Sequence, residues 1–467
     1  MATVVHPFQT NFTAGELTPK LAGHIDFDKY SNGLETLENM TTFPQGGVTR
    51  RAGSRFVAEV KDSSKSTRLI PFEFNITQSY CIEVGDQYMR FFKDRGQIVE
   101  ATKSISAITK ANPAVVTATS KVFEISTSYT QSQIFDLKFA QSADTMFIVH
   151  PSHEPAKLTR TGHTSWTLAD VDFQKGPYLD TNTTTTTLNP GSSGVGTGVA
   201  LVASADLFAS TDVGRLVKLH GGHCKITAFT DAQNVTMSIL TALDASTATT
   251  SWQLGYWSAT TGFPETVSFF EQRLIFGGTT AYPQTVFASE SGLYEEFDAG
   301  DGSAADAFIY TIAANRVNKI RWLAPGRDLI VGTAGGEFKV GRPTGEPLKP
   351  DNVQIIQQTT YGGYTTQPIQ IGSAILFVQR QARKVRQFIY RFADDAYEAP
   401  DMTILAEHIT EGGIVDVDFA QEPDSIYWAV RADGTLLGLT YNREQDVVAW
   451  HRHIIGGKGQ SCTVTVT

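Results

Sequence analysis

One short phrase occurs twice in this chain. Residues 138–150 read KFAQSADTMFIVH and residues 418–430 read DFAQEPDSIYWAV, so a Phe, an Ala, a Gln and an Asp keep the same register in both copies. In each copy the Asp is followed by a run of apolar and β-branched residues. A repeat of this kind predicts an architecture built from several copies of one unit.

Further segments between the two copies share a layout of approach strand, polar turn and strongly apolar strand. They are SFFEQRLIFGG (268–278), RWLAPGRDLIVGT (321–333) and IQIGSAILFVQ (369–379). Their turns, together with that of the last copy, are anchored on Gln272, Asp328, Ser373 and Asp424. The spacing is close to the roughly 40 to 50 residues of a four-stranded propeller blade. An earlier hairpin, SYCIEVGDQYMRFFKDRGQIV (79–99), is a candidate for one more unit.

Composition supports a β protein. The chain has 40 Gly, 28 Phe and 15 Tyr, which favours strands and tight turns, and no sustained stretch has the apolar period of a helix. We therefore predict a mainly β fold: a β-propeller-like repeat of four-stranded blades with an N-terminal platform segment. A non-repeating assembly of β-sandwiches is the alternative.

One region interrupts the repeat. It begins near DTNTTTTTLNPGSSGVGTG, a low-complexity stretch that is typical of a linker, and continues as short alternating strands. We predict a small β-barrel or sandwich inserted into the propeller. The predicted domains are an N-terminal segment (1–57), the first blades (58–177), the insert (178–256) and the remaining blades with C-terminal strands (257–467).

Several classes of protein are disfavoured. No apolar run has the roughly 18 residues of a membrane span, and the N-terminus lacks the pattern of an export signal. Cys81, Cys224 and Cys462 are an odd number without CxxC spacing, which indicates synthesis in a reducing cytosol. The net charge of −10 argues against a protein that grips nucleic-acid phosphates.

Motifs for catalysis and cofactor binding are missing from the sequence. It has no P-loop, zinc-protease, nucleophile-elbow or EF-hand pattern, so we expect no enzyme, cofactor or metal. His451 and His453 share one face of a predicted strand, but a tetrahedral metal needs more ligands, and we interpret them as a partly exposed pair at a strand end. The adjacent carboxylates Glu295-Glu296 and Asp394-Asp395 would point to opposite faces of a strand, which does not suit glycoside hydrolysis.

Two basic clusters stand out in this acidic chain. One contains Arg50, Arg51 and Arg55, behind the turn Pro44-Gln45-Gly46-Gly47. The other is QRQARKVRQFIYRF, which carries Arg380, Arg383, Lys384, Arg386 and Arg391. Such clusters are typical of ion pairs with a neighbouring subunit or of contacts with phosphate, and solvated surface charge is the alternative.

The N-terminal stretch FTAGELTPKLAGHIDFDKYSNGLETLENMTTFPQGGVTRRAGSRFV (12–57) resembles the opening of podovirus tail nozzle proteins, also called tail tubular protein B. That family has Gly-Glu-Leu-x-Pro, Gly-x-x-Asp-x-x-Lys-Tyr and Pro-Gln-Gly-Gly followed by Arg-Arg-x-Gly-x-Arg-Phe. Later segments, including KFAQSADTMFIVHPSHEPAKLTR and VVAWHRHIIGG, are similar to the same family, so the resemblance covers nearly the whole chain apart from residues 178–256. Family members usually continue beyond the point where this chain ends in GKGQSCTVTVT, which leaves closure of the propeller open.

The resemblance implies a structural virion protein that is assembled in the host cytoplasm. It implies a homohexameric ring below the portal and a tail adaptor protein, a channel that conducts double-stranded genomic DNA during ejection, and support for the tail fibre protein. An acidic bore would repel the DNA backbone rather than retain it. The candidate assembly contacts are Arg50, Arg51, Arg55, Glu16, Asp26, Lys29 and Tyr30.

Other functions remain as alternatives. A carbohydrate-binding or depolymerising β-propeller that acts on the host envelope would explain the many aromatic residues, since exposed rings stack on sugars. Such a protein should show a cleft with converging acids, whereas a nozzle should show large surfaces between subunits. A cytosolic scaffold would leave the N-terminal motifs unexplained.

Overall fold

The computed structural model describes residues 8–75, 78–105, 116–314, 318–343, 346 and 348–455. Strands make up almost all regular structure in this part of the chain, and the helical elements there are three short 3-10 helices, η1 (Pro19–Leu21), η2 (Tyr30–Asn32) and η3 (Ser210–Asp212). The prediction of a mainly β chain is confirmed. Within the described ranges, no helix has the length and apolar character needed to cross a membrane.

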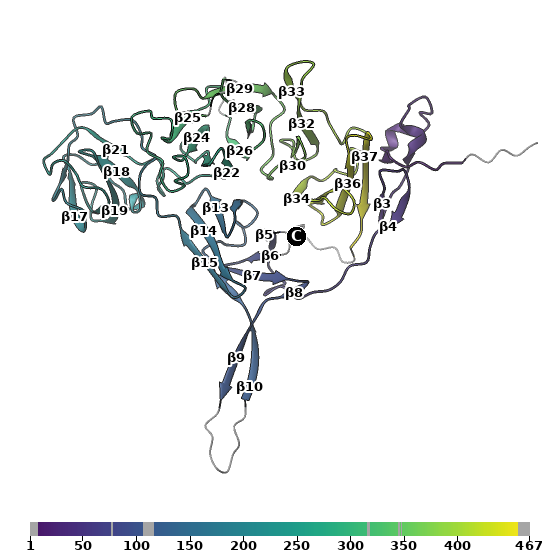
Figure 1. The fold of residues 1–467 in the computed structure, drawn as a ribbon, viewed down its shortest axis with the longest axis horizontal. Coiled ribbons are helices and arrows are strands. Elements are labelled where there is room, and N and C mark those ends of the chain that lie inside the picture. The colour runs from purple at the N-terminus through teal and green to yellow at the C-terminus, as the bar shows by residue number, and fades with distance from the viewer. Residues whose placement is uncertain are drawn as a thin grey trace, which may run out of the picture.

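Six antiparallel sheets form the blades of a propeller (Figure 1). Blade 1 contains β5 (Arg68–Asn75), β6 (Gln78–Gly85), β7 (Tyr88–Lys93) and β11 (Glu124–Ser126), with the short β8 (Gly96–Gln97) also beside β7. Blade 2 contains β12 (Lys138–Ser142), β13 (Thr145–His150), β14 (His153–Gly162) and β15 (Ser165–Asp170). Blade 3 contains β22 (Thr266–Phe270), β23 (Arg273–Gly277), β24 (Thr285–Ala288) and β25 (Phe308–Thr311).

The second half of the ring repeats this plan. Blade 4 contains β26 (Ile320–Ala324), β27 (Leu329–Thr333), β28 (Glu337–Gly341) and β29 (Gln354–Thr359). Blade 5 contains β30 (Ile369–Ile371), β31 (Ala374–Val378), β32 (Val385–Arg391) and β33 (Ala396–Glu398). Blade 6 contains β34 (Ile414–Ala420), β35 (Ile426–Arg431), β36 (Leu436–Asn442) and β37 (Val447–His453).

The repeated phrase marks equivalent positions in two blades. It forms the β12–β13 hairpin of blade 2 and the β34–β35 hairpin of blade 6, where the first strand of each blade pairs with the second. The other repeat segments form β22–β23, β26–β27 and β30–β31. The apolar second strands β23, β27 and β31 are buried along their whole length, because each lies inside a sheet covered on both faces. The predicted repeat of four-stranded blades is confirmed.

Apolar side chains join each blade to the next. Separate clusters combine blades 1 and 2, 2 and 3, 3 and 4, 4 and 5, and 5 and 6. The contact between blades 6 and 1 is different, since Arg68 Nη2 of β5 lies 3.6 Å from Asp416 Oδ1 of β34, and both side chains are buried. The ring is thus closed by a polar contact between the inner strands of its first and last blades.

The N-terminal segment extends the sheet of blade 6. Strand β1 (Gly15–Glu16) pairs in parallel with β37 and with β2 (Gly33–Leu34), which gives a six-stranded sheet. Farther along, β3 (Met40–Thr42) and β4 (Val48–Arg50) form a hairpin that packs on β36 and β37. Residues 51–67 then lead across to blade 1, as Figure 1 shows.

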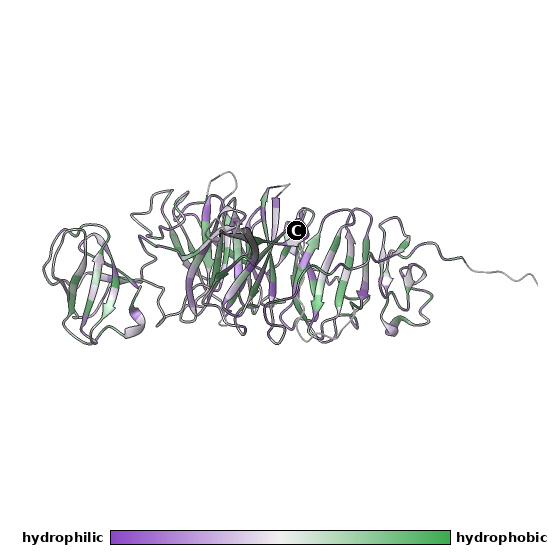
Figure 2. Cartoon of the chain, turned by 90° about the horizontal axis from the view of Figure 1, so that it is seen from below, coloured by the Kyte–Doolittle hydropathy of each residue, from purple (hydrophilic) through white to green (hydrophobic). Residues whose placement is uncertain are grey.

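The insert between blades 2 and 3 is a separate sheet with its own core. It contains β16 (Leu188–Pro190), β17 (Gly196–Ala203), β18 (Leu216–Leu219), β19 (Gly222–Phe229), β20 (Asn234–Ile239) and β21 (Trp252–Leu254). Buried side chains such as Leu201, Val217 and Met237 fill the space inside it. Figure 2 shows this domain at one end of the molecule and the N-terminal segment at the other.

A long hairpin projects from blade 1. Strands β9 (Val99–Ile105) and β10 (Val116–Val122) pair only with each other and point away from the propeller (Figure 1). The candidate unit at residues 79–99 forms β6, β7 and β8, so its turn joins the second and third strands of blade 1 rather than the first two.

Candidate functional site

The N-terminal segment, which carries the motifs that suggested a function, begins on blade 6 at Gly15. This residue has a positive φ of 64°, and its backbone lies so close to β37 that an added Cβ would be 2.5 Å from Trp450 N. Only glycine fits this approach without strain. The Gly-Glu-Leu motif therefore has a structural cause in the pairing of β1 with β37.

Glu16, the next residue, is fully buried at the centre of a polar cluster. Its Oε2 accepts hydrogen bonds from Leu37 N at 2.7 Å and from Arg452 Nε at 3.2 Å, and its Oε1 lies 2.9 Å from His408 Nε2. A buried carboxylate is stable only when it is paired in this way. Glu16 fixes the N-terminal segment to blade 6 within the same chain, so any effect on assembly passes through the position of that segment.

The other three candidates from these motifs, Asp26, Lys29 and Tyr30, lie near the surface of the segment. Lys29 pairs with the carboxylate of Asp446 in the turn between β36 and β37, and its Nζ also donates to Asp446 O at 3.1 Å. The Tyr30 hydroxyl accepts from Gly23 N at 3.2 Å. Asp26 is exposed. Lys29 and Tyr30 thus hold a loop whose tip presents Asp26 to solvent.

The three candidate arginines lie after this loop. Arg50 ends β4 and is exposed, Arg51 is half-buried with Nη1 donating to Ala52 O at 3.0 Å, and Arg55 is exposed in the link to blade 1. The described residues give none of them an ion pair within the chain. Their role as contacts with another subunit stays a prediction.

The second basic cluster is largely paired within the chain. Lys384 Nζ lies 2.6 Å from Asp401 Oδ2, Arg391 Nε lies 2.9 Å from Glu398 Oε2, and Arg386 is buried with its guanidinium over the Tyr361 ring. A groove of about 570 Å³ lies between η1 and blades 5 and 6, and Arg383, Glu407 and His408 are among its lining residues. This groove carries both signs of charge, so it does not form a uniformly basic surface for phosphate.

The two histidines of β37 are completely buried, which corrects the expectation of a partly exposed pair. His451 Nδ1 and His453 Nε2 lie 2.7 Å apart in a hydrogen bond. Burial lowers the pKa of His451 to about 3 and that of His453 to about 4. Within the described ranges, no group of three or more His, Cys, Asp or Glu side chains is arranged to hold a metal ion.

Hydrogen bonds cross the propeller axis beside a cavity of about 170 Å³ that is lined by Arg68, Phe139, Gln367 and Asp416, among others. Phe139 N of β12 donates to Gln367 Oε1 at 3.4 Å, and Gln367 Nε2 donates to Phe139 O at 3.0 Å. Lys138 Nζ also donates to Thr365 O, and burial lowers the pKa of this amine to about 7. These bonds join blade 2 to the segment that enters blade 5, on the opposite side of the ring. No sequence pattern predicted these bonds, because Gln367 belongs to a linking segment between the repeats.

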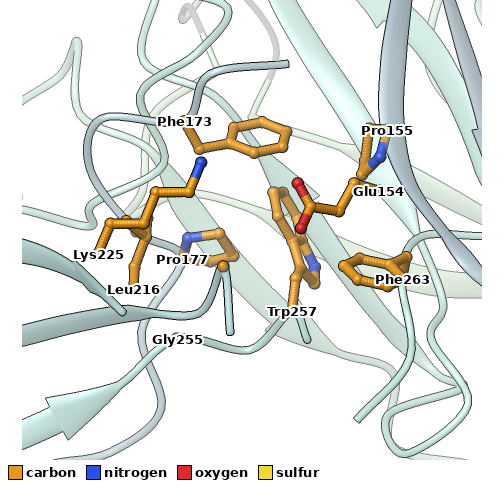
Figure 3. Close-up of a pocket in the computed structure, with 11 residues that line it drawn as sticks. Glu154, Pro155, Phe173, Pro177, Leu216, Lys225, Gly255, Trp257 and Phe263 are labelled. Carbon is orange, nitrogen blue, oxygen red and sulfur yellow. The ribbon is translucent and has the colours of Figure 1, made fainter. Parts of the chain in front are cut away.

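A small cavity lies where the insert meets blades 2 and 3 (Figure 3). Glu154, Phe173, Leu216 and Trp257 are among its lining residues, and its volume is about 30 Å³. This is space for roughly one or two waters, far below the several hundred Å³ of a typical ligand site. Burial raises the pKa of Glu154.

A larger groove of about 560 Å³ shares Glu154 with this cavity. It is also lined by Ser128, His153 and Asp170, and His153 Nδ1 lies 3.4 Å from Ser128 Oγ. Glu154 and Asp170 lie on the neighbouring strands β14 and β15. Two carboxylates on one wall of a groove are the feature that a carbohydrate-acting propeller requires.

The sheet order defines the chain as a β-propeller protein with an inserted β-domain. No family model and no curated protein sequence matches it.

Solved structures that are similar to it include apo AztD from Citrobacter koseri, with 9% identity and a TM-score of 0.36 over 84% of this chain and 87% of that chain. Another is the WD40 domain of Pan2 from Neurospora crassa, with 7% identity and a TM-score of 0.30 over 69% and 79%. A third is an auxiliary nutrient binding protein from Bacteroides thetaiotaomicron, with 10% identity and a TM-score of 0.27 over 62% and 72%. At these TM-scores the likenesses carry no inference about function.

Proposed function

We propose that the chain is a structural virion protein, the tail nozzle subunit of a short-tailed phage. In this proposal six copies form a ring below the portal and adaptor, conduct genomic DNA during ejection and support the tail fibres. The proposal rests on the side chains that the N-terminal segment, which contains the family motifs, presents at its surface. Buried Glu16 fixes the start of this segment in place, yet the segment exposes apolar Ile25 (85%) and Phe56 (75%), and among the described residues Arg50, Arg51 and Arg55 form no ion pair.

Exposed apolar side chains such as those of Ile25 and Phe56 suit burial against a second protein surface. The arginines of the same segment would supply charged contacts of defined geometry, because a guanidinium binds carboxylates in a bidentate manner. The N-terminal segment therefore has both components of a subunit interface, an apolar part and a charged rim.

In this proposal each propeller forms part of the wall of the tube. Because Phe139 and Gln367 bond across the centre, DNA would pass between subunits of the ring and not through a single propeller. The net charge of −10 per chain suits such a passage, since a like-charged wall repels the DNA backbone. The insert and the β9–β10 hairpin supply further surfaces for the adaptor and fibre.

The test measures the mass of the purified full-length protein in solution, together with negative-stain images. We expect sixfold rings with a central opening. Ile25→Asp combined with Phe56→Asp should shift the protein to monomers, and Leu293→Asp, at an exposed apolar residue of blade 3, is the matched control. Rings that survive the double substitution would contradict the proposed interface. A protein that stays monomeric, also when mixed with an adaptor ring, would contradict the nozzle function.

The groove beside Glu154 favours a second candidate function, binding of host-envelope carbohydrate. Here the half-buried Glu154 and the exposed Asp170 would be the two carboxylates beside the glycosidic bond, and burial raises the pKa of Glu154. Monomers that bind or cleave bacterial polysaccharide, and that lose this activity in Asp170→Asn, would establish the second candidate in place of the first.

A further inference from the structure

The buried histidine pair of β37 lies beneath the N-terminal hairpin β3–β4. The Thr440 hydroxyl of β36 donates to Thr42 O of β3 at 3.0 Å and lies 3.2 Å from His451 Nε2. The imidazole of His451 packs directly on Gly438, where an added Cβ would be 2.0 Å from its Cε1. The pair is therefore enclosed by blade 6 on one side and by the hairpin on the other.

The surroundings of the pair contain no compensating negative charge among the described groups that pack on it. From β35 the neighbour is the Trp428 ring, with centroids 6.0 Å and 5.2 Å from those of His451 and His453. From β36 the neighbours are Gly438 and Thr440, whose hydroxyl bonds Thr42 O of the hairpin, and Arg51, directly after β4, acts on His453. Arg51 is cationic and, after burial, is the second cause that lowers the pKa of His453.

The hydrogen bond between the imidazoles requires one nitrogen to donate and the other to accept. A neutral pair meets this requirement, whereas two imidazolium rings would direct N–H groups at each other without a counter-ion. Protonation is thus opposed by burial, by mutual repulsion and by Arg51. Between about pH 6.5 and pH 4 the rings therefore gain a proton more readily when exposed to water than when enclosed.

The hairpin is the weakest part of this enclosure. Strand β37 is held by a continuous ladder to β36, whereas β3–β4 is a two-stranded sheet, a unit that is marginal alone in water. Its edge is bound to β37 through Asn39 N to Arg452 O at 2.8 Å and Ile454 N to Asn39 Oδ1 at 3.0 Å. Lifting the hairpin would hydrate both imidazoles and leave the blade intact.

We propose that β3–β4 is an acid-released cover: protonation of His451 and His453 detaches the hairpin from blade 6. The direction of the pH effect follows from the difference in histidine pKa between the docked and the released hairpin. Both histidines have folded pKa values below the ordinary 6.5, so they stabilise the docked hairpin fully above about pH 6.5, and this contribution is lost as the pH falls toward 4. This acid-dependent release of the hairpin does not depend on the proposed nozzle function.

Amide hydrogen exchange of the full chain at pH 7, 6 and 5, corrected for the intrinsic rate, tests the proposal. We expect protection of residues 40–50 to fall about twentyfold from pH 7 to pH 5 if one histidine titrates, and further if both do. Protection in β35 and β36 should stay constant. Protection of 40–50 that does not change with pH would overturn the proposal, as would a parallel loss in β35 and β36.

Two variants test whether the pH dependence of protection comes from His451 and His453. His451→Gln combined with His453→Gln removes both titrating groups and should make protection of residues 40–50 independent of pH. If thermal unfolding shows that the double variant is not folded, His453→Gln alone should reduce the dependence at least several-fold. His24→Gln, at an exposed histidine of the same segment, is the matched control and should behave like the unmodified protein. An unchanged pH dependence in His453→Gln would overturn the assignment.

Discussion

At the scale of single residues, we expect a substitution of buried Glu16 to lower the free energy of unfolding. Glu16→Ala leaves Leu37 N without its acceptor and removes the carboxylate that pairs with Arg452 and His408. Breaking a buried pair costs about 3–5 kcal/mol, and because Arg452 and His408 are partly exposed we expect a loss of about 2 kcal/mol in the free energy of unfolding. Urea denaturation measures this loss. Glu35→Ala, at an exposed carboxylate of the same segment, should change stability by less than about 0.5 kcal/mol, and equal effects of the two would contradict the role of Glu16.

The Gly-Glu-Leu motif pointed to Glu16, but no sequence pattern predicted its partners Arg452 and His408. Glu16 and Arg452 lie near opposite ends of the chain, and only the pairing of β1 with β37 brings them together. The histidine pair illustrates the same limit. Alternation along a strand correctly places His451 and His453 on one face, but their burial depends on Thr42 and its hairpin, which local patterns near residue 450 do not contain.

At the scale of secondary-structure elements, a glycine inside a strand marks a close approach. Gly332 lies in β27, and a Cβ added there would be 2.0 Å from Cε2 of the fully buried Trp322. We expect Gly332→Ala to lower stability by about 1–3 kcal/mol, because the ring must leave its position in the core between blades 4 and 5. Thermal unfolding measures the shift. Gly194→Ala, where no atom lies within 4 Å of the added Cβ, should leave the midpoint nearly unchanged, and a similar loss in both variants would exclude this cause.

The apolar strands that follow polar turns could be predicted as elements, because burial on both faces demands a continuous apolar run such as residues 329–333. Blade 1 shows where this fails. Its first strand, β5, contains Pro71, which cannot donate to a ladder and argues against a central strand. Because β5 pairs only with β6, it is an edge strand that tolerates proline, and its position at the edge becomes clear only from the sheet order.

At the scale of the whole molecule, the insert is a removable unit. The chain enters and leaves it side by side, since Leu179 N donates to Leu254 O at 2.8 Å and Tyr256 N donates to Pro177 O at 2.9 Å. Most of its apolar side chains form a core inside the insert, while Leu216 packs with the cluster of blades 2 and 3, and Lys218 Nζ lies 2.6 Å from Asp298 Oδ2 beyond blade 3's strand β24. The low-complexity stretch predicted that an insert exists, whereas the contacts across the axis and the number of blades became known only from the structure.

Replacing residues 180–253 by a two-residue Asn-Gly turn should therefore leave a folded propeller. The paired strands at 178–179 and 254–256 already have the spacing that such a turn closes, and the deletion removes only Leu216 and Leu240 from the apolar cluster that joins blades 2 and 3. Circular dichroism and thermal unfolding of the shortened chain test this, with deletion of β26–β29 as the control that removes a blade and should abolish folding. A shortened chain that fails to fold would mean that the insert stabilises the propeller through contacts such as Lys218–Asp298, and that the two units fold as one.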